Sequence, residues 1–229
     1  VISDYDLHEN NTILNNSKIL ILGAHPEYWS FEMRNNLDIF LKRGGNLIYL
    51  GGNGIYWKIT YSDDGALMEV RKDYVNHTQT DELGGKWRDL YNDKGIELNE
   101  AAYLGVAYTR EGYGTYAPYK VYNSTHWIYN NTNLKDGDLV GAYGLFDKNK
   151  DGIGDGASGW ETDKINAFSP NNITILGIGD NKEGGANMIY FENNNSKVFS
   201  VGSITFVQSL VVDKNLTIML NNILDKWLM

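Results

Sequence analysis

Apolar and polar positions follow two different periods near the start of the chain. A continuous apolar run, Lys18 to Leu22, predicts a buried strand, whereas Phe31 to Arg43 repeats its apolar side chains at helical spacing. Ser30 is a good N-cap for this helix, and Gly44-Gly45 ends it. A second apolar run, Asn46 to Leu50, predicts another strand. The order strand, helix, strand indicates two parallel neighbouring strands.

Each of these two strands is followed by a loop that is rich in polar and aromatic side chains. The first loop reads Gly23-Ala-His-Pro-Glu-Tyr-Trp-Ser30, and the second reads Gly51-Gly-Asn-Gly-Ile-Tyr-Trp57. Ligands of α/β sheets bind beyond the carboxyl ends of the strands. We therefore expect the two loops to share one rim and to form a binding or active site there.

The rest of the chain gives a coarser pattern. We expect an entering strand at Val1 to Leu7, a hairpin from strands 57–61 and 66–74, and long irregular connections over residues 76–138. Three late strands, at Ile173–Ile178, Ala186–Phe191 and Lys197–Val201, precede a closing helix at Leu216–Leu228. At 229 residues the chain is long enough for one domain, and we assign residues 1–229 to it, with an insertion at 147–158.

Charge and composition exclude several classes of function. The net charge of −9 argues against nucleic-acid binding, because no basic patch is available to displace counterions. The absence of cysteine excludes thiolate nucleophiles, disulfides and Cys-ligated metal sites. The sequence contains no run of 18 apolar residues and therefore predicts no transmembrane helix. The first residue is Val1, so we expect a processed product or part of a longer chain or oligomer.

A loop with alternating oxygen side chains predicts a calcium site. In a 12-residue calcium-binding loop that begins at Asp147, the side-chain ligands at positions 1, 3 and 5 would be Asp147, Asn149 and Asp151. Gly152 permits the sharp turn, the Ile153 carbonyl would be the ligand at position 7, and Asp155 the ligand at position 9. Position 12 is Ser158 instead of the usual glutamate, so a plain acidic turn is the alternative. Eight Asn-x-Ser/Thr sequons, together with this loop, favour a glycoprotein at the cell surface or outside the cell; the other location is cytoplasmic.

Three side chains outside this loop are candidates for chemistry. His25 lies at the proposed rim, where it can handle protons, although a packing role is the alternative. Asn53 lies in a tight turn that can present amides to an oxyanion, or it is an ordinary turn residue. Glu161 beside Trp160 can be a metal ligand or an acid/base, or a solvated strand carboxylate.

Several of these motifs together resemble a known family. The segments His25-Pro-Glu-Tyr-Trp-Ser30, Gly44-Gly-Asn-Leu47, Gly52-Asn53 and Gly154-Asp-Gly-Ala-Ser-Gly-Trp-Glu-Thr-Asp163 resemble the carboxy-terminal domain of the N,N-dimethylformamidase large subunit and its relatives. The resemblance covers nearly the whole chain. It implies an α/β, flavodoxin-like three-layer sandwich of the class I glutamine amidotransferase type, with a mainly parallel sheet and long irregular insertions.

The resemblance also implies a single iron held by two tyrosines and one glutamate. The matching positions are Tyr28, Tyr56 and Glu161, which are hard donors suited to Fe(III) as a Lewis acid. The family is also thought to use a histidine close to its glutamate, where this chain has Gly159 and Trp160. His25 is the obvious replacement.

Three functions therefore stay open. The chain is a mononuclear-metal hydrolase of a small amide, a non-catalytic surface module that binds a protein or carbohydrate and is stabilised by calcium, or a structural subunit of a surface assembly.

Overall fold

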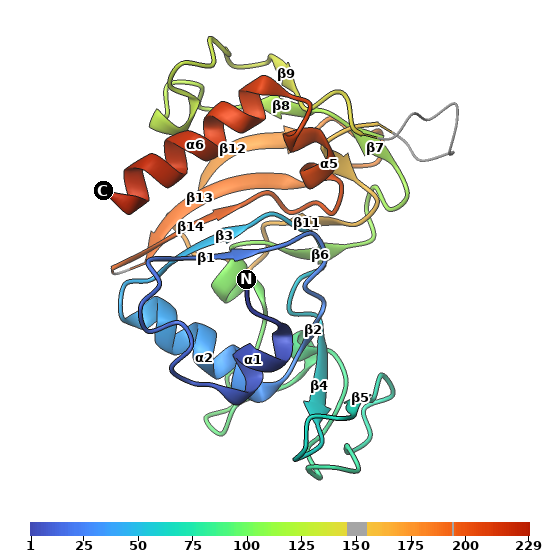
Figure 1. The fold of residues 1–229 in the computed structure, drawn as a ribbon. Helices are drawn as coiled ribbons and strands as arrows, with labels where there is room; N and C mark the ends of the chain where they lie inside the picture. Colours follow the sequence, from blue (N-terminus) through green and yellow to red (C-terminus); the bar gives the residue numbers. More distant parts are fainter. Residues whose placement is uncertain (146–154, 194) are drawn as a thin grey trace.

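The computed structural model describes residues 1–145, 155–193 and 195–229, and its centre is a seven-stranded sheet with helices on both faces (Figure 1). The strand order is β1 (Ile19–Leu22), β3 (Asn46–Tyr49), β14 (Ser196–Ser200), β13 (Asn187–Asn193), β12 (Thr174–Gly179), β8 (Tyr119–Val121) and β9 (Leu139–Val140). Helices α1 (Asp4–Glu9) and α2 (Phe31–Lys42) lie on one face, and α5 (Phe206–Leu210) and α6 (Lys214–Leu228) lie on the other.

Smaller elements lie around this sheet, most of them near one end. They are β2 (Tyr28–Trp29), β4 (Trp57–Tyr61), β5 (Met68–Val70), η1 (Trp87–Asp89), α3 (Ala101–Leu104), β6 (Ala107–Thr109), β7 (Tyr116–Ala117), η2 (Trp127–Tyr129), β10 (Ser158–Gly159) and β11 (Thr162–Lys164). Of these, η2 packs against α6. Strand β2 pairs in parallel with β4, β4 forms the expected hairpin with β5, and β6 pairs with β11. The short elements between residues 76 and 138 agree with the expected irregular connections.

The prediction of a mainly parallel, flavodoxin-like sheet is wrong. The pairs β1–β3 and β3–β14 are parallel, but β14–β13, β13–β12, β12–β8 and β8–β9 are antiparallel. Strand β13 ends at Asn193 and β14 begins at Ser196, a separation that allows a hairpin but no crossover. The short connection at residues 180–186 imposes the same direction change between β12 and β13. The fold is a mixed α/β architecture.

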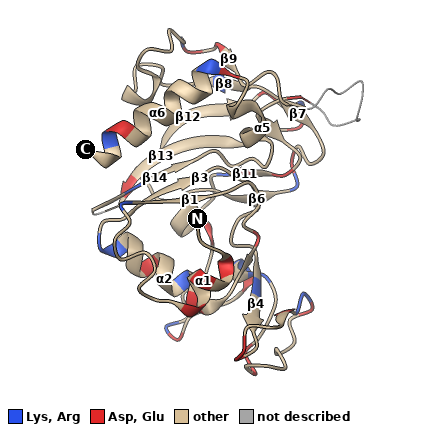
Figure 2. Ribbon diagram, in the orientation of Figure 1, with Lys and Arg blue, Asp and Glu red and all other residues tan. Residues whose placement is uncertain are grey.

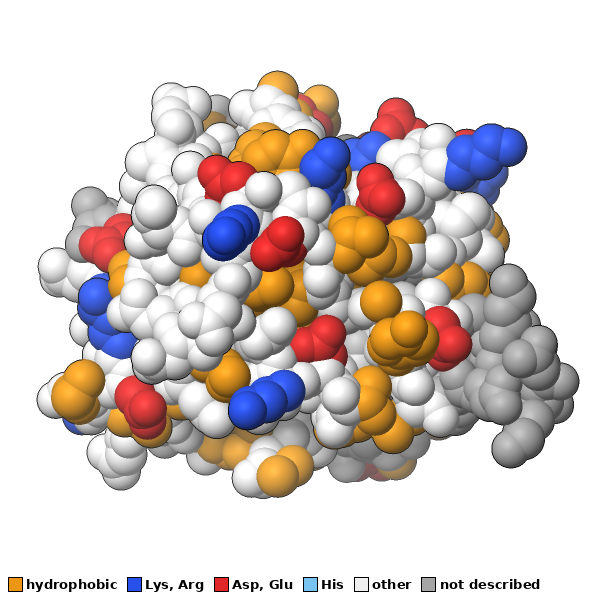
Figure 3. All heavy atoms as spheres, turned by 90° about the horizontal axis from the view of Figure 1, so that it is seen from above, with side chains coloured by type: hydrophobic (Ala, Val, Ile, Leu, Met, Phe, Trp, Pro, Cys, Tyr) orange, Lys and Arg blue, Asp and Glu red, His pale blue; other side chains and the backbone are white. Residues whose placement is uncertain are grey.

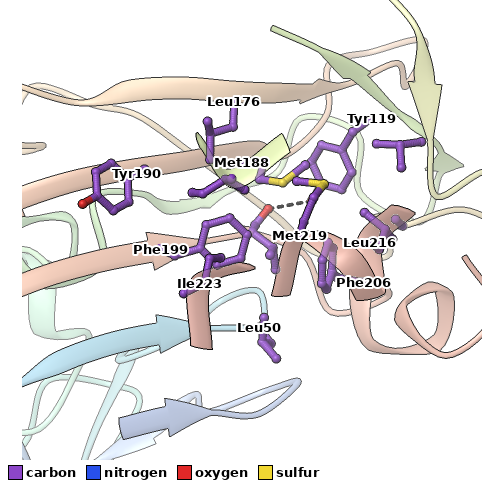
Figure 4. Close-up of a cluster of buried hydrophobic side chains, with 14 of the residues drawn as sticks. Leu50, Tyr119, Leu176, Met188, Tyr190, Phe199, Phe206, Leu216, Met219 and Ile223 are labelled. Atoms are coloured by element: carbon purple, nitrogen blue, oxygen red, sulfur yellow. Dashed lines mark hydrogen bonds between the residues drawn. The ribbon is translucent and has the colours of Figure 1, made fainter. Parts of the chain in front are cut away.

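The sheet separates two hydrophobic cores because its side chains alternate between the faces. On β13, Met188 and Tyr190 pack toward α6, while Ile189 and Phe191 pack toward α2. Figure 4 shows the first of these cores, in which Leu176, Met188 and Phe199 from the sheet meet Met219 and Ile223 from α6. Charged side chains lie mainly on the helices and peripheral loops, and the central strands are almost free of them (Figure 2).

The start of the chain also differs from expectation. Residues Asp4–Glu9 form a helix instead of an entering strand. The Asp6 amide donates to Ser3 Oγ at 3.1 Å, and the Ser3 amide donates back to Asp6 Oδ2 at 2.7 Å. This reciprocal cap satisfies two donors at the helix start and outweighs the alternating pattern. By contrast, α2 begins where predicted, since the Met33 amide donates to Ser30 Oγ at 3.2 Å.

On the α6 side of the molecule, apolar side chains lie in separate groups among charged ones and form no continuous apolar surface (Figure 3). None of the helices in the described ranges is long and apolar enough to cross a membrane.

Candidate active site

The loops after β1 and β3 lie side by side, as the sequence predicted. Backbone hydrogen bonds join them: the Gly52 amide donates to Ala24 O at 3.2 Å, and the Tyr56 amide donates to Glu27 O at 2.8 Å. In the short parallel pair that follows, Tyr28 lies opposite Trp57. The two Tyr-Trp pairs therefore share one rim at the carboxyl ends of the parallel strands.

A third segment, containing Glu161, closes against these loops. A Cβ on Gly52 would lie only 2.6 Å from Glu161 O, so only glycine allows this approach. The loop after β14 holds the same segment, because the Asp163 amide donates to Gly202 O at 2.8 Å. The loops that follow the carboxyl ends of β1, β3 and β14 therefore meet at the segment that contains Glu161.

A pocket of about 570 Å³ lies where these segments meet. It brings together Asn53, Tyr56 and Glu161, three of the side chains predicted from the sequence. The other residues that line it are Glu27, Trp57, Tyr108, Arg110 and Tyr113. Glu27 and Trp57 belong to the two loops that the sequence predicted to form the rim, whereas no sequence pattern pointed to Tyr108, Arg110 and Tyr113.

His25 lies at the edge of this pocket, against its two carboxylates. His25 Nε2 is 3.0 Å from Glu161 Oε2 and 3.4 Å from Glu27 Oε2, with 40% of the side chain exposed. Hydrogen bonding to Glu161 raises the pKa of His25, and burial opposes this effect. The imidazole that the sequence places 136 positions before Glu161 is therefore its neighbour in space.

Two buried oxygens of the pocket have little or no hydrogen bonding within the described part of the chain. Asn53 Nδ2 donates to Glu27 Oε1 at 3.1 Å, which fixes the orientation of the amide and leaves Asn53 Oδ1 without a partner there. Glu161 Oε2 is also buried, and its contact is with the His25 imidazole at 3.0 Å. A buried acceptor without a donor is costly, so this arrangement favours a ligand that supplies a cation or N–H donors.

The backbone amides of the Asn53 turn are already engaged. The Asn53 amide donates to Asp163 Oδ1 at 2.8 Å, and the Gly54 amide donates to Tyr49 Oη at 2.8 Å. Tyr49 in turn donates to Asp163 Oδ2 at 2.8 Å, and burial raises the pKa of Asp163 to about 7. These two amides support the site through Asp163, so the contribution of Asn53 to a ligand comes from its side chain.

Three residues of the site hold left-handed backbone conformations without being glycine. The φ angles are 54° at Asn53, 52° at Ile55 and 63° at Trp160. A β-branched residue such as Ile55 rarely adopts this conformation. Local strain of this kind is typical of functional sites, where the surrounding structure enforces it.

Tyr28 lies beside this pocket and does not line it. Its hydroxyl accepts a hydrogen bond from Lys72 Nζ at 3.3 Å, and the same ammonium lies 4.9 Å from the centre of the Trp57 ring. Trp57 lines the pocket, so Tyr28 is the strand neighbour of a lining residue.

The predicted calcium loop falls mostly outside the described residues. Asp147, Asn149, Asp151 and Ile153 lie there, and only Asp155 is described, as a half-buried residue. The calcium site stays a prediction.

Comparison with known proteins assigns the family. A family model described as N,N-dimethylformamidase beta subunit-like, C-terminal, matches residues 1–218. The chain belongs to this family. Among its relatives are the N,N-dimethylformamidase beta subunits of Paracoccus aminophilus, 24% identical, and of an Alcaligenes species, 23% identical, each over 271 residues. Both alignments cover 100% of this chain but 34% of the relative, so the chain spans about a third of each relative's length.

Proposed function

We propose that this dimethylformamidase-like domain carries the metal-dependent active site of a hydrolase that acts on a small amide. The observation that carries the proposal is a set of buried oxygens on one pocket: Asn53 Oδ1, which has no partner among the described residues, and Glu161 Oε2, which contacts only His25 there, beside the Tyr56 phenol. Family membership supports amide chemistry, because the relatives are named as dimethylformamidase subunits.

The side chains of the pocket fit a hard metal ion such as iron. Phenol and carboxylate oxygens are hard donors, and Tyr56 and Glu161 supply one of each. In the described ranges, no three His, Asp or Glu side chains are placed to hold a metal by themselves, so tyrosine is a necessary part of the set. We propose Tyr28 as the second tyrosine because the family resemblance implies it; its hydroxyl is bonded to Lys72 beside the pocket and would have to turn from Lys72 to reach the metal. When bound, the metal polarises an amide carbonyl or a water molecule.

The chain's own side chains handle the substrate and the protons. His25 is the imidazole nearest to both carboxylates, so we assign it the proton that the leaving nitrogen requires. Asn53 Oδ1 can accept an N–H from a primary or secondary amide, while its Nδ2 holds Glu27 in place. The aromatic rings of Tyr56, Trp57 and Tyr108 give the pocket apolar surface beside these polar groups.

The test is metal content and visible absorption of purified protein loaded with Fe(III). Tyrosinate bound to Fe(III) absorbs in the visible range, so we expect a purple to brown protein. Tyr56→Phe and Glu161→Gln should lose the band and the metal with the fold intact, and Tyr28→Phe should do the same if it is the second tyrosine. Tyr122→Phe is the matched control, since Tyr122 is exposed and does not line the pocket.

A colourless protein that binds no iron would contradict the metal site. Absence of turnover by iron-loaded protein over a panel of small amides would contradict the hydrolase and favour the alternative, a binding or structural surface module. Location at the cell surface and calcium binding are parts of the proposal that separate measurements must test.

A further inference from the structure

A second pocket, of about 360 Å³, lies beside the candidate active site and is lined mainly by apolar groups. Ala24, Ile204 and Val207 provide aliphatic surface, and Tyr116 and Trp160 provide aromatic surface. Thr205 and Gln208 also line it. The Thr205 hydroxyl donates to Gly156 O at 2.8 Å, whereas Gln208 Nε2 is buried and has no acceptor among the described residues. We refer to this hollow as the apolar pocket.

Consecutive residues connect the apolar pocket to the candidate active site. Ala24 lines the apolar pocket and His25 follows it; Trp160 lines the apolar pocket and Glu161 follows it. Neighbouring Cα atoms are only about 3.8 Å apart. Two separate segments thus place a residue of the apolar pocket directly before His25 and directly before Glu161.

The Trp160 ring lines the apolar pocket and lies near one aromatic ring of each pocket. Tyr113, which lines the candidate active site, lies 6.1 Å from it, and Tyr116, which lines the apolar pocket, lies 6.3 Å from it. The Trp160 amide donates to Thr115 O at 3.0 Å, and Trp160 O accepts from the Gly114 amide at 2.8 Å. These bonds fix a left-handed backbone that places the ring, although 47% of the residue remains exposed.

We propose that the apolar pocket binds a hydrophobic substituent of the amide substrate, with the amide group itself at His25 and Glu161. This inference rests on the proposed function. An engineered cavity of about 150 Å³ accommodates benzene, so the volume here is sufficient for a phenyl ring or a short alkyl chain. The substrate class is therefore an amide with an aryl or alkyl substituent larger than methyl.

The first test is binding of N-benzylformamide and N-methylformamide, measured by calorimetry on metal-free and iron-loaded protein. We expect the benzyl compound to bind at least about tenfold more tightly, since each methylene in a fitting pocket changes selectivity by about tenfold or more. Trp160→Ala, which removes the indole that lines the apolar pocket, and Val207→Phe, which fills the pocket, should both reduce this ratio toward one. Phe168→Ala is the matched control, because Phe168 is 42% exposed and lies outside both pockets.

The second test is the ratio of kcat/KM for the same two amides in the iron-loaded variants. The ratio should fall in Trp160→Ala and Val207→Phe and stay unchanged in Phe168→Ala. Equal binding of the two amides, or a ratio unaffected in both pocket variants, would refute the subsite. Selective binding of the benzyl compound without turnover of either amide would instead refute the proposed hydrolysis and support the pocket as a ligand site.

Discussion

The parallel and antiparallel halves of the central sheet contribute differently to the molecule: one supports the candidate site and the other the hydrophobic core. The parallel half, β1, β3 and β14, ends in the three loops that carry or hold His25, Asn53 and Glu161. The antiparallel half, β13, β12, β8 and β9, contributes buried side chains such as Leu176 and Met188 to the core under α6. Residues of the candidate site thus cluster where strands run the same way.

This difference follows from strand direction. Parallel neighbours place their carboxyl ends on one edge, so the loops that follow converge, whereas antiparallel neighbours alternate the edge at which they end. Changes at the end of the parallel half should therefore alter chemistry with little effect on stability. Changes inside the antiparallel half should alter stability and leave the chemistry intact.

The largest effect is expected for His25→Ala. Turnover of a small amide by iron-loaded protein should fall by about 10²–10⁴-fold, the usual contribution of a general acid or base, with iron content unchanged. Because the side chain is 40% exposed, the melting temperature should change little. Undiminished turnover would remove His25 from the proposed mechanism, and loss of iron would move it into the ligand set.

Leu176→Ala tests the contribution of the antiparallel half of the sheet to stability. Leu176 is fully buried between the sheet and α6 (Figure 4), so its truncation should cost about 3–5 kcal/mol of unfolding free energy. Denaturant titration measures this cost, and Leu139→Ala, at an exposed position, should cost less than about 0.5 kcal/mol. If the variant folds but loses the visible band, the two halves are coupled more closely than we infer.

Removal of calcium tests the loop at 147–158. If the loop binds calcium in the folded state, a hundredfold excess over Kd stabilises the protein by about 2.7 kcal/mol, and chelation should remove this stabilisation. Thermal melts with calcium and with chelator measure the difference, and Asp151→Asn should reduce it. Identical melts under both conditions would support the plain acidic turn.

A smaller effect is expected for Asp163→Asn. Asp163 accepts from Tyr49 Oη and from the Asn53 amide, and an amide side chain can accept only one of these donors. The unpaired donor should cost about 1–3 kcal/mol and loosen the Asn53 turn. Asp180→Asn, at an exposed position, is the control for denaturant titration. A cost equal to that of the control would indicate that Asp163 does not hold the site together.

The sequence predicts the parallel half well because its signals are local. The apolar runs, the Ser30 cap and the glycines after each strand specify β1, α2 and β3 nearly to the residue. The rim formed by the Tyr-Trp pairs also follows, since strand direction determines which ends meet. The structure agrees with the sequence on these points.

Other features depend on contacts between distant segments. The directions of β12, β13 and β14 depend on the short connections between them, which allow only antiparallel hairpins. The apolar pattern within each strand contains no information about its direction. The contact between His25 and Glu161 and the burial of Asp163 arise only after the loops pack together. The apolar pocket likewise requires Ala24, Trp160 and Val207 to meet from three parts of the chain.

The position of β14 has a consequence for the order of folding. The Lys197 amide bonds to Asn46 Oδ1 across 151 positions of sequence, and β14 pairs with β3 along its length. Such distant pairing forms slowly, whereas the hairpins of the antiparallel half close locally. During synthesis, β3 therefore lacks this partner until about 150 further residues have been made. The rim that holds Glu161 is therefore among the last parts to assemble, and shortening the chain before β14 should abolish it even with every proposed ligand present.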